Sequence, residues 1–353
     1  MNDRGLDLTA TDILKSNIIG SIQDSEKQKY TDKWEDIEES IGRDNFSDLF
    51  SHIRMVYRRS KPQGILVKEF NAHVKPKENP EQFINDILVP YSEAYTNILN
   101  ENYTSEEKAE SINLVLGWLN KVDNSDWIPP AINYVSKYRN EPEKLLNFLQ
   151  KLERLASCMM IFRENINYRI KRYADLLNWI QSGKDVLENE SPIHLSNNEI
   201  DKTLTALEGN VYESTRTRLM ILLRLDSILS DSSAKYNHKV ITVEHVLPQT
   251  PESSSEWINW IPDEEKRRSL VHRLGNLALL SRAKNSSAKN YELDKKKNSY
   301  FKVKGVSPFA ITTQVLSKDI WDEEVILNRQ KEYIEKLSAE WDLTKSCVNL
   351  CPE

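Results

Sequence analysis

The chain has 353 residues, of which 39% are hydrophobic and 29% charged, and its formal net charge is −6 at pH 7. This length suggests two domains, with room for a third, and the composition suits a soluble globular protein. No apolar run approaches the length of a membrane span, and the first residues lack the apolar core of a signal peptide. Three cysteines (Cys158, Cys347 and Cys351) argue against a disulfide framework or a zinc site. A cytoplasmic location is therefore expected.

Most of the first 230 residues have the apolar spacing of helices. A short helix is expected to open near Leu8, with Thr9 or Thr11 as its N-cap. Further helices are predicted over 25–41, 44–59 and 80–99, from 105 onward, from 142 through about 180, and over 198–208 and 213–230. Residues 61–64 and Pro129–Pro130 break the pattern, and 183–198 is predicted to be a loop or linker. The arginines Arg216, Arg218 and Arg224 are interpreted as an exposed helical face, with phosphate binding as the alternative.

The pattern changes after Asp231. The β-branched residues Val240–Val243 predict a short strand that delivers Glu244 and His245 to a turn at Pro248. The remaining elements expected are a helix over 262–273, a buried strand over 277–280, a basic helix that follows Ser281–Asn290, and a final helix over 321–341. The sequence thus predicts a mainly α protein with one small strand pair near its C-terminal end.

A basic segment follows the second predicted strand. Residues 282–304 carry eight basic side chains against Glu292 and Asp294. The basic residues are Arg282, Lys284, Lys289, Lys295, Lys296, Lys297, Lys302 and Lys304. Such a run is usually a solvated face, but beside a candidate phosphodiesterase site it predicts a footprint for a polyanion.

The most specific motif is Glu244-His245-x-x-Pro248-Gln249, followed by Asn276 and then by Asn285 nine residues later. A carboxylate and an amide oxygen are hard ligands suited to Mg²⁺ or Mn²⁺. A histidine next to the carboxylate on an extended segment projects to the opposite side, where it can take a proton from water. Glu244 and Asn285 are therefore the expected metal ligands, and His245 the expected general base.

Acid, histidine, asparagine and asparagine in this order resemble the HNH, or ββα-metal, nucleases. Residues 235–341 resemble, more closely, the C-terminal HNH domain of GmrSD-type modification-dependent restriction enzymes. The matching features are Glu244-His245-x-x-Pro248-Gln249, Leu274-Gly275-Asn276-Leu277-x-Leu279-Leu280, Asn285, Lys295 and Lys296 with Tyr300, and Trp321 with Arg329. The stretch Asn2–Lys15 is similar to the end of the ParB-like nucleotidase domain of such proteins. The resemblance then implies the C-terminal part of a larger nuclease, or a split product of one.

The resemblance implies a division into a nucleotidase remnant at 1–25, a helical domain at 26–232 and an HNH domain at 233–353 embedded in helices. It implies that the catalytic residues are His245 and Asn276, with Asn276 holding the loop that aims His245. DNA, from phage or modified, is the implied substrate, with a nucleotidase domain or subunit as a partner. The basic residues expected to contact DNA are Arg282, Lys284, Lys289, Lys295 and Lys296. Two features depart from many HNH enzymes: Glu244 replaces an aspartate, and the segment between His245 and Asn276 is long.

Other interpretations stay open at the level of sequence. Asn276 could cap a helix and Asn285 could begin the next one. His272 is interpreted as a helix-surface residue or a DNA contact, with a catalytic part as the alternative. The second hypothesis for the whole chain is a catalytically silent, helical interaction module, and the third is an HNH protein that acts on RNA. A double-strand break would require a second copy, so homo-oligomerisation is a further expectation to test.

Overall fold

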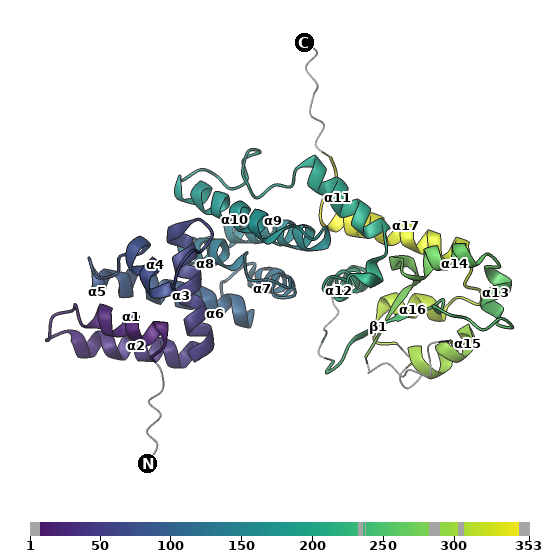
Figure 1. The fold of residues 1–353 in the computed structure, drawn as a ribbon, viewed down its shortest axis with the longest axis horizontal. Helices are drawn as coiled ribbons and strands as arrows, with labels where there is room; N and C mark the ends of the chain where they lie inside the picture. Colours follow the sequence, from purple (N-terminus) through teal and green to yellow (C-terminus); the bar gives the residue numbers. More distant parts are fainter. Residues whose placement is uncertain (1–7, 232–235, 237, 282–289, 303–306, 346–353) are drawn as a thin grey trace, which may run out of the picture. The chain divides into compact units, whose positions relative to one another are not determined.

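The computed structural model describes residues 8–231, 236, 238–281, 290–302 and 307–345, and of Tyr300 only the backbone. The chain is mainly helical, as predicted, with one pair of short strands in the part described (Figure 1). It folds into two compact units. The first comprises Met1–Ser157 and Glu164–Leu195, and the second comprises Cys158–Arg163 and Ser196–Glu353. Within the described ranges, no helix has the length and apolarity that a bilayer crossing requires.

The first unit is built from helices. They are α1 (Ala10–Ile19), α2 (Lys27–Ile41), α3 (Arg43–Arg58), α4 (Leu66–His73), α5 (Pro80–Gln82), the π-helical η1 (Phe83–Leu88), α6 (Val89–Asn100), α7 (Ala109–Leu119), α8 (Ile128–Lys137), α9 (Pro142–Ile161, whose last turn falls in the second unit) and α10 (Ile166–Gln181). Thr9 is the N-cap of α1 and forms a capping box with Asp12, which confirms one of the two expected caps.

Aromatic side chains fill part of the first unit's core. Trp34 of α2 contacts Phe46 and Phe50 of α3 at ring-centroid distances of 5.5 and 5.2 Å. Phe50 in turn contacts Phe70 of α4 at 5.1 Å. These rings are fully buried, and their edge-to-face and tilted contacts are the preferred aromatic geometries. The amphipathic spacing of α3 therefore explains why it packs at the centre of this unit.

Three expectations for the helices are corrected. The predicted tract from 142 to about 180 is two helices, because Arg163 has a left-handed backbone (φ 56°) and Asn165 caps the start of α10. The predicted helix over 213–230 begins later: a 3₁₀ turn, η2 (Val211–Glu213), precedes α12 (Arg218–Leu229). Pro129 and Pro130, which were expected only to interrupt the chain, lie in the first turn of α8, where a missing N–H does no harm.

The second unit contains the strand pair. Its further elements are α11 (Asn197–Glu208), β1 (Thr242–His245), α13 (Glu256–Trp260), α14 (Glu264–Val271), the 3₁₀ turn η3 (Leu274–Asn276), β2 (Leu277–Leu280), α15 (Leu293–Lys296), the π-turn η5 (Lys297–Phe301), α16 (Ala310–Leu316) and α17 (Glu323–Glu340). The expected helix near 262–273, the second strand and the final helix are confirmed. The expected basic helix is the single turn α15 continued by η5.

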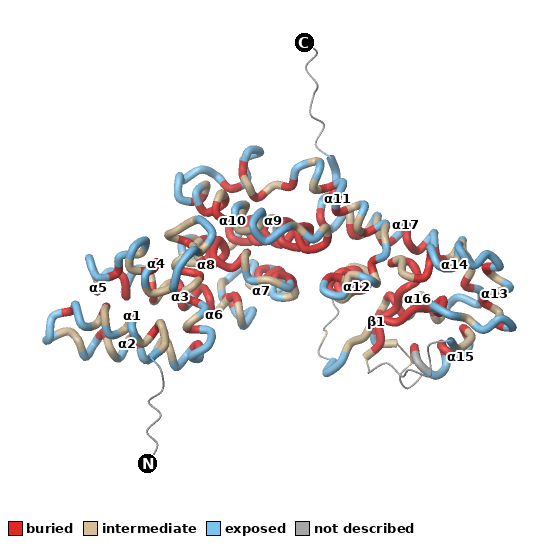
Figure 2. The backbone as a smooth tube through the Cα atoms, viewed as in Figure 1, coloured by how far each residue is buried: buried red, intermediate tan, exposed pale blue. Residues whose placement is uncertain are grey.

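The two strands pair antiparallel, with Glu244 opposite Ala278 and His245 opposite Leu277. The first strand was expected at 240–243 and lies two residues later, because every residue of β2 is buried and Thr242–His245 is the segment that pairs with it. Glu244 and His245 are thus part of the strand rather than of the turn after it. Figure 2 shows β1 and its surroundings among the buried segments of this unit.

Candidate active site

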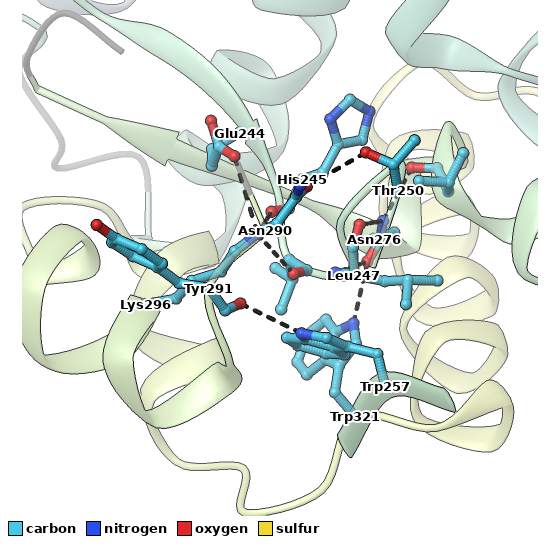
Figure 3. Close-up of polar contacts among 12 residues, drawn as sticks. Glu244, His245, Leu247, Thr250, Trp257, Asn276, Asn290, Tyr291, Lys296 and Trp321 are labelled. Carbon is cyan, nitrogen blue, oxygen red and sulfur yellow. Dashed lines mark hydrogen bonds and ion pairs between the residues drawn. The ribbon is translucent and has the colours of Figure 1, made fainter. Parts of the chain in front are cut away.

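The strand β1 presents two adjacent polar side chains from a buried backbone. Glu244 is 9% exposed and His245 is 5% exposed. Consecutive residues of a strand project to opposite faces, and Figure 3 shows these two side chains pointing away from each other. Packing of the neighbouring residues Val246 and Leu247, which are fully buried, holds this end of the strand in the core. A carboxylate and an imidazole are therefore fixed on opposite faces of the same end of β1.

Asn276 uses its whole side-chain amide to hold the turn that follows β1. Its Oδ1 accepts from the backbone N–H of Leu247 at 2.7 Å and from the indole N–H of Trp321 at 3.0 Å. Its Nδ2 donates to the carbonyl oxygens of Leu247 at 3.1 Å and Val271 at 2.8 Å (Figure 3). Two acceptor and two donor positions are all that an amide has. Asn276 is also fully buried. Its amide therefore positions the backbone of the turn, and none of its hydrogen-bonding positions is left for a substrate.

The turn that carries Asn276 is anchored to α17. The N–H of Gly275 donates to the side-chain oxygen of Gln330 at 2.7 Å, and Arg329 donates to the Gly275 carbonyl. A β-carbon on Gly275 would lie 2.8 Å from the backbone nitrogen of Gln330 and closer still to the carbonyl oxygen of Ile326. The glycine is needed because the helix backbone approaches to contact distance. α17 therefore acts as the support for Asn276.

His245 lies in a group of aromatic rings. Its Nε2 is 3.1 Å from Nδ1 of His272, the C-cap residue of α14. The ring of Tyr212, from η2, packs against the imidazole of His245 at a centroid distance of 3.9 Å. Sequence reasoning weighed His272 but missed Tyr212, which lies thirty-three positions before His245 and carries no spacing signal. Only the fold brings η2 to this strand.

Lys296 requires a correction. It was expected to contact DNA, but its side chain is 2% exposed and its Nζ donates to the carbonyl oxygens of His245 at 2.7 Å and Val246 at 2.9 Å. A buried ammonium bound to two carbonyls is not available to a phosphate on the surface. Nζ also lies 3.9 Å from Oε1 of Glu244, a separation that allows an ion pair but is too long for a hydrogen bond between these two atoms.

Lys295 faces the other way. It is exposed, and its Nζ lies over the ring of Tyr291 at 3.6 Å from the centroid. An exposed lysine stacked on an aromatic ring presents its ammonium on the solvent side, where a partner can reach it. The remaining expected DNA contacts, Arg282, Lys284 and Lys289, and the expected metal ligand Asn285 lie outside the described residues.

The donor set at this point suits a hard cation. Glu244 supplies carboxylate oxygens, and Mg²⁺ in proteins is held by one or two such oxygens together with water. Over the described ranges, no group of three His, Cys, Asp or Glu side chains could hold a metal. A closed zinc cage, which needs four protein ligands, is therefore not what these described residues form. Of the two expected Mg²⁺ ligands, Glu244 is the one whose position fits a site for a hard cation. The second expected ligand is the side-chain amide of Asn285.

The comparison with known families assigns this part of the chain. Residues 197–336 match the family model described as GmrSD restriction endonucleases, C-terminal domain, so this segment is similar to the C-terminal domain of those enzymes. The match covers about two fifths of the chain and begins at the first residue of α11, one residue after the start of the Ser196–Glu353 segment. It contains Tyr212, Glu244, His245, His272, Asn276, Lys296 and Trp321. No curated protein matches the chain.

Proposed function

We propose that this chain is a Mg²⁺-dependent HNH endonuclease that nicks DNA. The observation that carries the proposal is the arrangement in which Asn276 binds both backbone groups of Leu247, two residues beyond His245. That arrangement fixes an acid–histidine pair at the end of a buried strand. The restriction-endonuclease family of residues 197–336 supports a phosphodiester substrate in DNA.

In the proposed reaction, His245 is the general base. Its imidazole takes a proton from a water molecule, and the water oxygen forms a bond to phosphorus. The bond from phosphorus to the 3′ oxygen breaks, and that oxygen gains a proton from solvent. A positioned general base typically contributes about 10²–10⁴-fold to the rate. Burial of His245 restricts its ring and so keeps the reactive nitrogen in one direction.

Glu244 and Asn285 are the proposed ligands of the Mg²⁺ ion, with water in the other positions, and Mn²⁺ is the expected substitute. When bound, the ion supplies stabilisation of the negative charge that develops around the phosphate. Glu244 lies 3.9 Å from the ammonium of Lys296, and its side chain points away from that of His245.

Contacts to the DNA backbone are proposed for Arg282, Lys284, Lys289 and the exposed Lys295. Contacts of this kind position a duplex without reading its sequence. A single site cuts one strand, so nicking is the expected product of a monomer, and two copies would be needed for a double-strand break. A role in restriction of phage or modified DNA, in the cytoplasm and together with a nucleotidase domain or subunit, is part of the proposal.

The test is relaxation of supercoiled plasmid by the full chain in Mg²⁺. His245→Ala should abolish nicking, whereas His194→Ala, the same change in the first unit, should leave it at the wild-type rate. Single-stranded RNA is assayed in parallel, and cleavage of RNA alone would reassign the substrate. A wild-type chain that cleaves neither polymer would favour an interaction module instead. Retained nicking by His245→Ala would assign the base to another residue.

A further inference from the structure

A second histidine adjoins the proposed general base and has no role in the reaction described above. Nδ1 of His272 lies 3.1 Å from Nε2 of His245, within hydrogen-bonding distance. The two rings meet nearly edge to face, with centroids 5.2 Å apart and planes at 64°. A bond between two neutral imidazoles needs one donor and one acceptor, so one ring places its N–H proton between the two nitrogens and the other ring accepts it.

The direction of this bond follows from the task proposed for His245. To take a proton from water, a neutral imidazole needs a lone pair on the nitrogen that faces the water. Nε2 of His245 is engaged by His272, and in the proposed reaction Nδ1 is the nitrogen that takes the proton from water. Nδ1 has its lone pair only when the proton of the ring is on Nε2, and that proton then points at Nδ1 of His272. His272 is thus placed to select the reactive tautomer.

The position of His272 is itself supported. The backbone N–H of Tyr212 donates to the carbonyl oxygen of His272 at 3.0 Å, and the two rings stack with planes 16° apart. Arg218 donates to the Tyr212 carbonyl at 2.9 Å and lies over its ring at 4.5 Å from the centroid. Arg218 of α12 therefore holds Tyr212 in place, and Tyr212 holds His272 at the end of α14. These contacts keep the imidazole of His272 beside that of His245.

We propose that His272 is a positioning residue for the general base: it accepts a hydrogen bond from Nε2 of His245, fixes the tautomer with a lone pair on Nδ1, and stabilises the imidazolium that forms when His245 takes its proton. This inference rests on the proposed function of His245. The gain arises in the transition state, because a hydrogen bond to a charged imidazolium is stronger than one to a neutral imidazole.

Four residues surround the pair. Among the described residues, Tyr212 packs on both rings, Arg218 lies beyond Tyr212, Lys296 binds the His245 carbonyl, and Glu244 points from the opposite face of β1. Replacement of His272 removes its ring from Tyr212 but leaves the contacts of Tyr212 and Lys296 with His245 in place.

Two variants of His272 separate positioning from other roles. His272→Leu removes the acceptor but keeps the backbone carbonyl that Tyr212 uses, whereas His272→Asn places an amide oxygen close to the position of Nδ1. We expect His272→Leu to lower kcat for plasmid nicking about 10²-fold with little change in KM, and His272→Asn to recover at least about tenfold of that loss. His194→Leu, in the first unit, is the matched control and should behave as wild type.

Other outcomes would overturn the inference. A raised KM with unchanged kcat would make His272 a DNA contact, and wild-type kinetics would leave it without a role at His245. Should the wild-type chain fail to nick at all, the proposed function fails first. The pair is then tested by ¹⁵N spectra of histidine-labelled chain: a His245 ring protonated only on Nε2 that becomes a tautomer mixture in His272→Leu supports it, and unchanged tautomers refute it.

Discussion

The ammonium of Lys296 lies 2.7 Å from the carbonyl oxygen of His245 and serves this residue's backbone rather than the solvent. A charged donor shared between two consecutive carbonyls at the end of β1 fixes the peptide planes there. The direction in which the His245 side chain leaves the strand depends on those planes. A lysine fifty-one positions away in sequence is therefore part of the support of the proposed base.

Exchange of Lys296 for methionine should affect both stability and catalysis. Lys296→Met keeps most of the apolar stem but leaves two buried carbonyls without their charged donor, which costs about 2 kcal/mol of unfolding free energy. Chemical unfolding measures this loss, and we expect kcat for nicking to fall with it. Lys295→Met is the matched change on the exposed side of the same turn. It should weaken DNA binding and reduce its salt dependence, with stability nearly unchanged. Equal effects of the two variants would contradict the division of roles.

Loss of the Asn276 amide should be among the most damaging changes in the second unit. Asn276→Ala leaves the Leu247 N–H, the Leu247 and Val271 carbonyls and the Trp321 indole without their partner, and we expect a loss of at least about 3 kcal/mol. Trp321→Phe removes one of these four bonds and should cost less. Thermal unfolding of the two variants checks the order. A smaller loss for Asn276→Ala than for Trp321→Phe would show that the amide does not hold the turn.

A methyl group at Gly275 should push the turn that carries Asn276 away from α17. Gly275→Ala forces the turn away from α17, because the new β-carbon meets backbone atoms of Ile326 and Gln330 that cannot rotate aside. We expect a loss of about 3 kcal/mol and a lower kcat. Gly64→Ala is the control, since its β-carbon would meet only the Glu69 side chain at ordinary contact distance, 3.6 Å. Equal melting temperatures for the two variants would remove the basis for this role of α17.

The first unit should lose stability in mild acid through His52. Burial, together with the nearby charge of Arg54, lowers the pKa of His52 from 6.5 to about 4. The folded pKa lies below the unfolded one, so protonation favours unfolding: the contribution of neutral His52 is complete above pH 6.5 and is lost as the pH falls towards 4. The shift corresponds to roughly 3 kcal/mol. Urea unfolding at pH 7 and pH 4.5 measures it. His52→Phe should show a weaker pH dependence than wild type, and the exposed His73→Phe the same dependence as wild type.

The sequence predicted the elements of the candidate site better than their connections. Local signals placed α14, β2 and α17, because capping residues, a fully apolar run and helical spacing are properties of neighbouring residues. The same signals placed β1 two residues early, since its ends are set by pairing with β2. Lys296 was predicted to contact DNA at the surface, because three consecutive lysines are typical of an exposed charged face. The direction of each side chain depends on the helical turn, which buries the second lysine and exposes the first.

The contacts around His245 could not be predicted from local patterns. Tyr212, His272 and Lys296 come from three separate elements, and no spacing relates them. The resemblance to HNH domains implied that Asn276 positions the loop next to His245. In the structure its side chain makes four hydrogen bonds, three of them to backbone groups. Their partners, Leu247, Val271 and Trp321, are defined only when the chain has folded.

The proposed metal-dependent reaction is tested by the rate of plasmid nicking as a function of Mg²⁺ concentration for the wild-type chain and Glu244→Gln. We expect no nicking in EDTA, a saturating dependence on Mg²⁺ for wild type, and a curve for Glu244→Gln that is shifted to higher Mg²⁺ and lower in maximal rate. Nicking that persists in EDTA, or a Glu244→Gln curve that superimposes on that of wild type, would contradict the proposed role of Glu244.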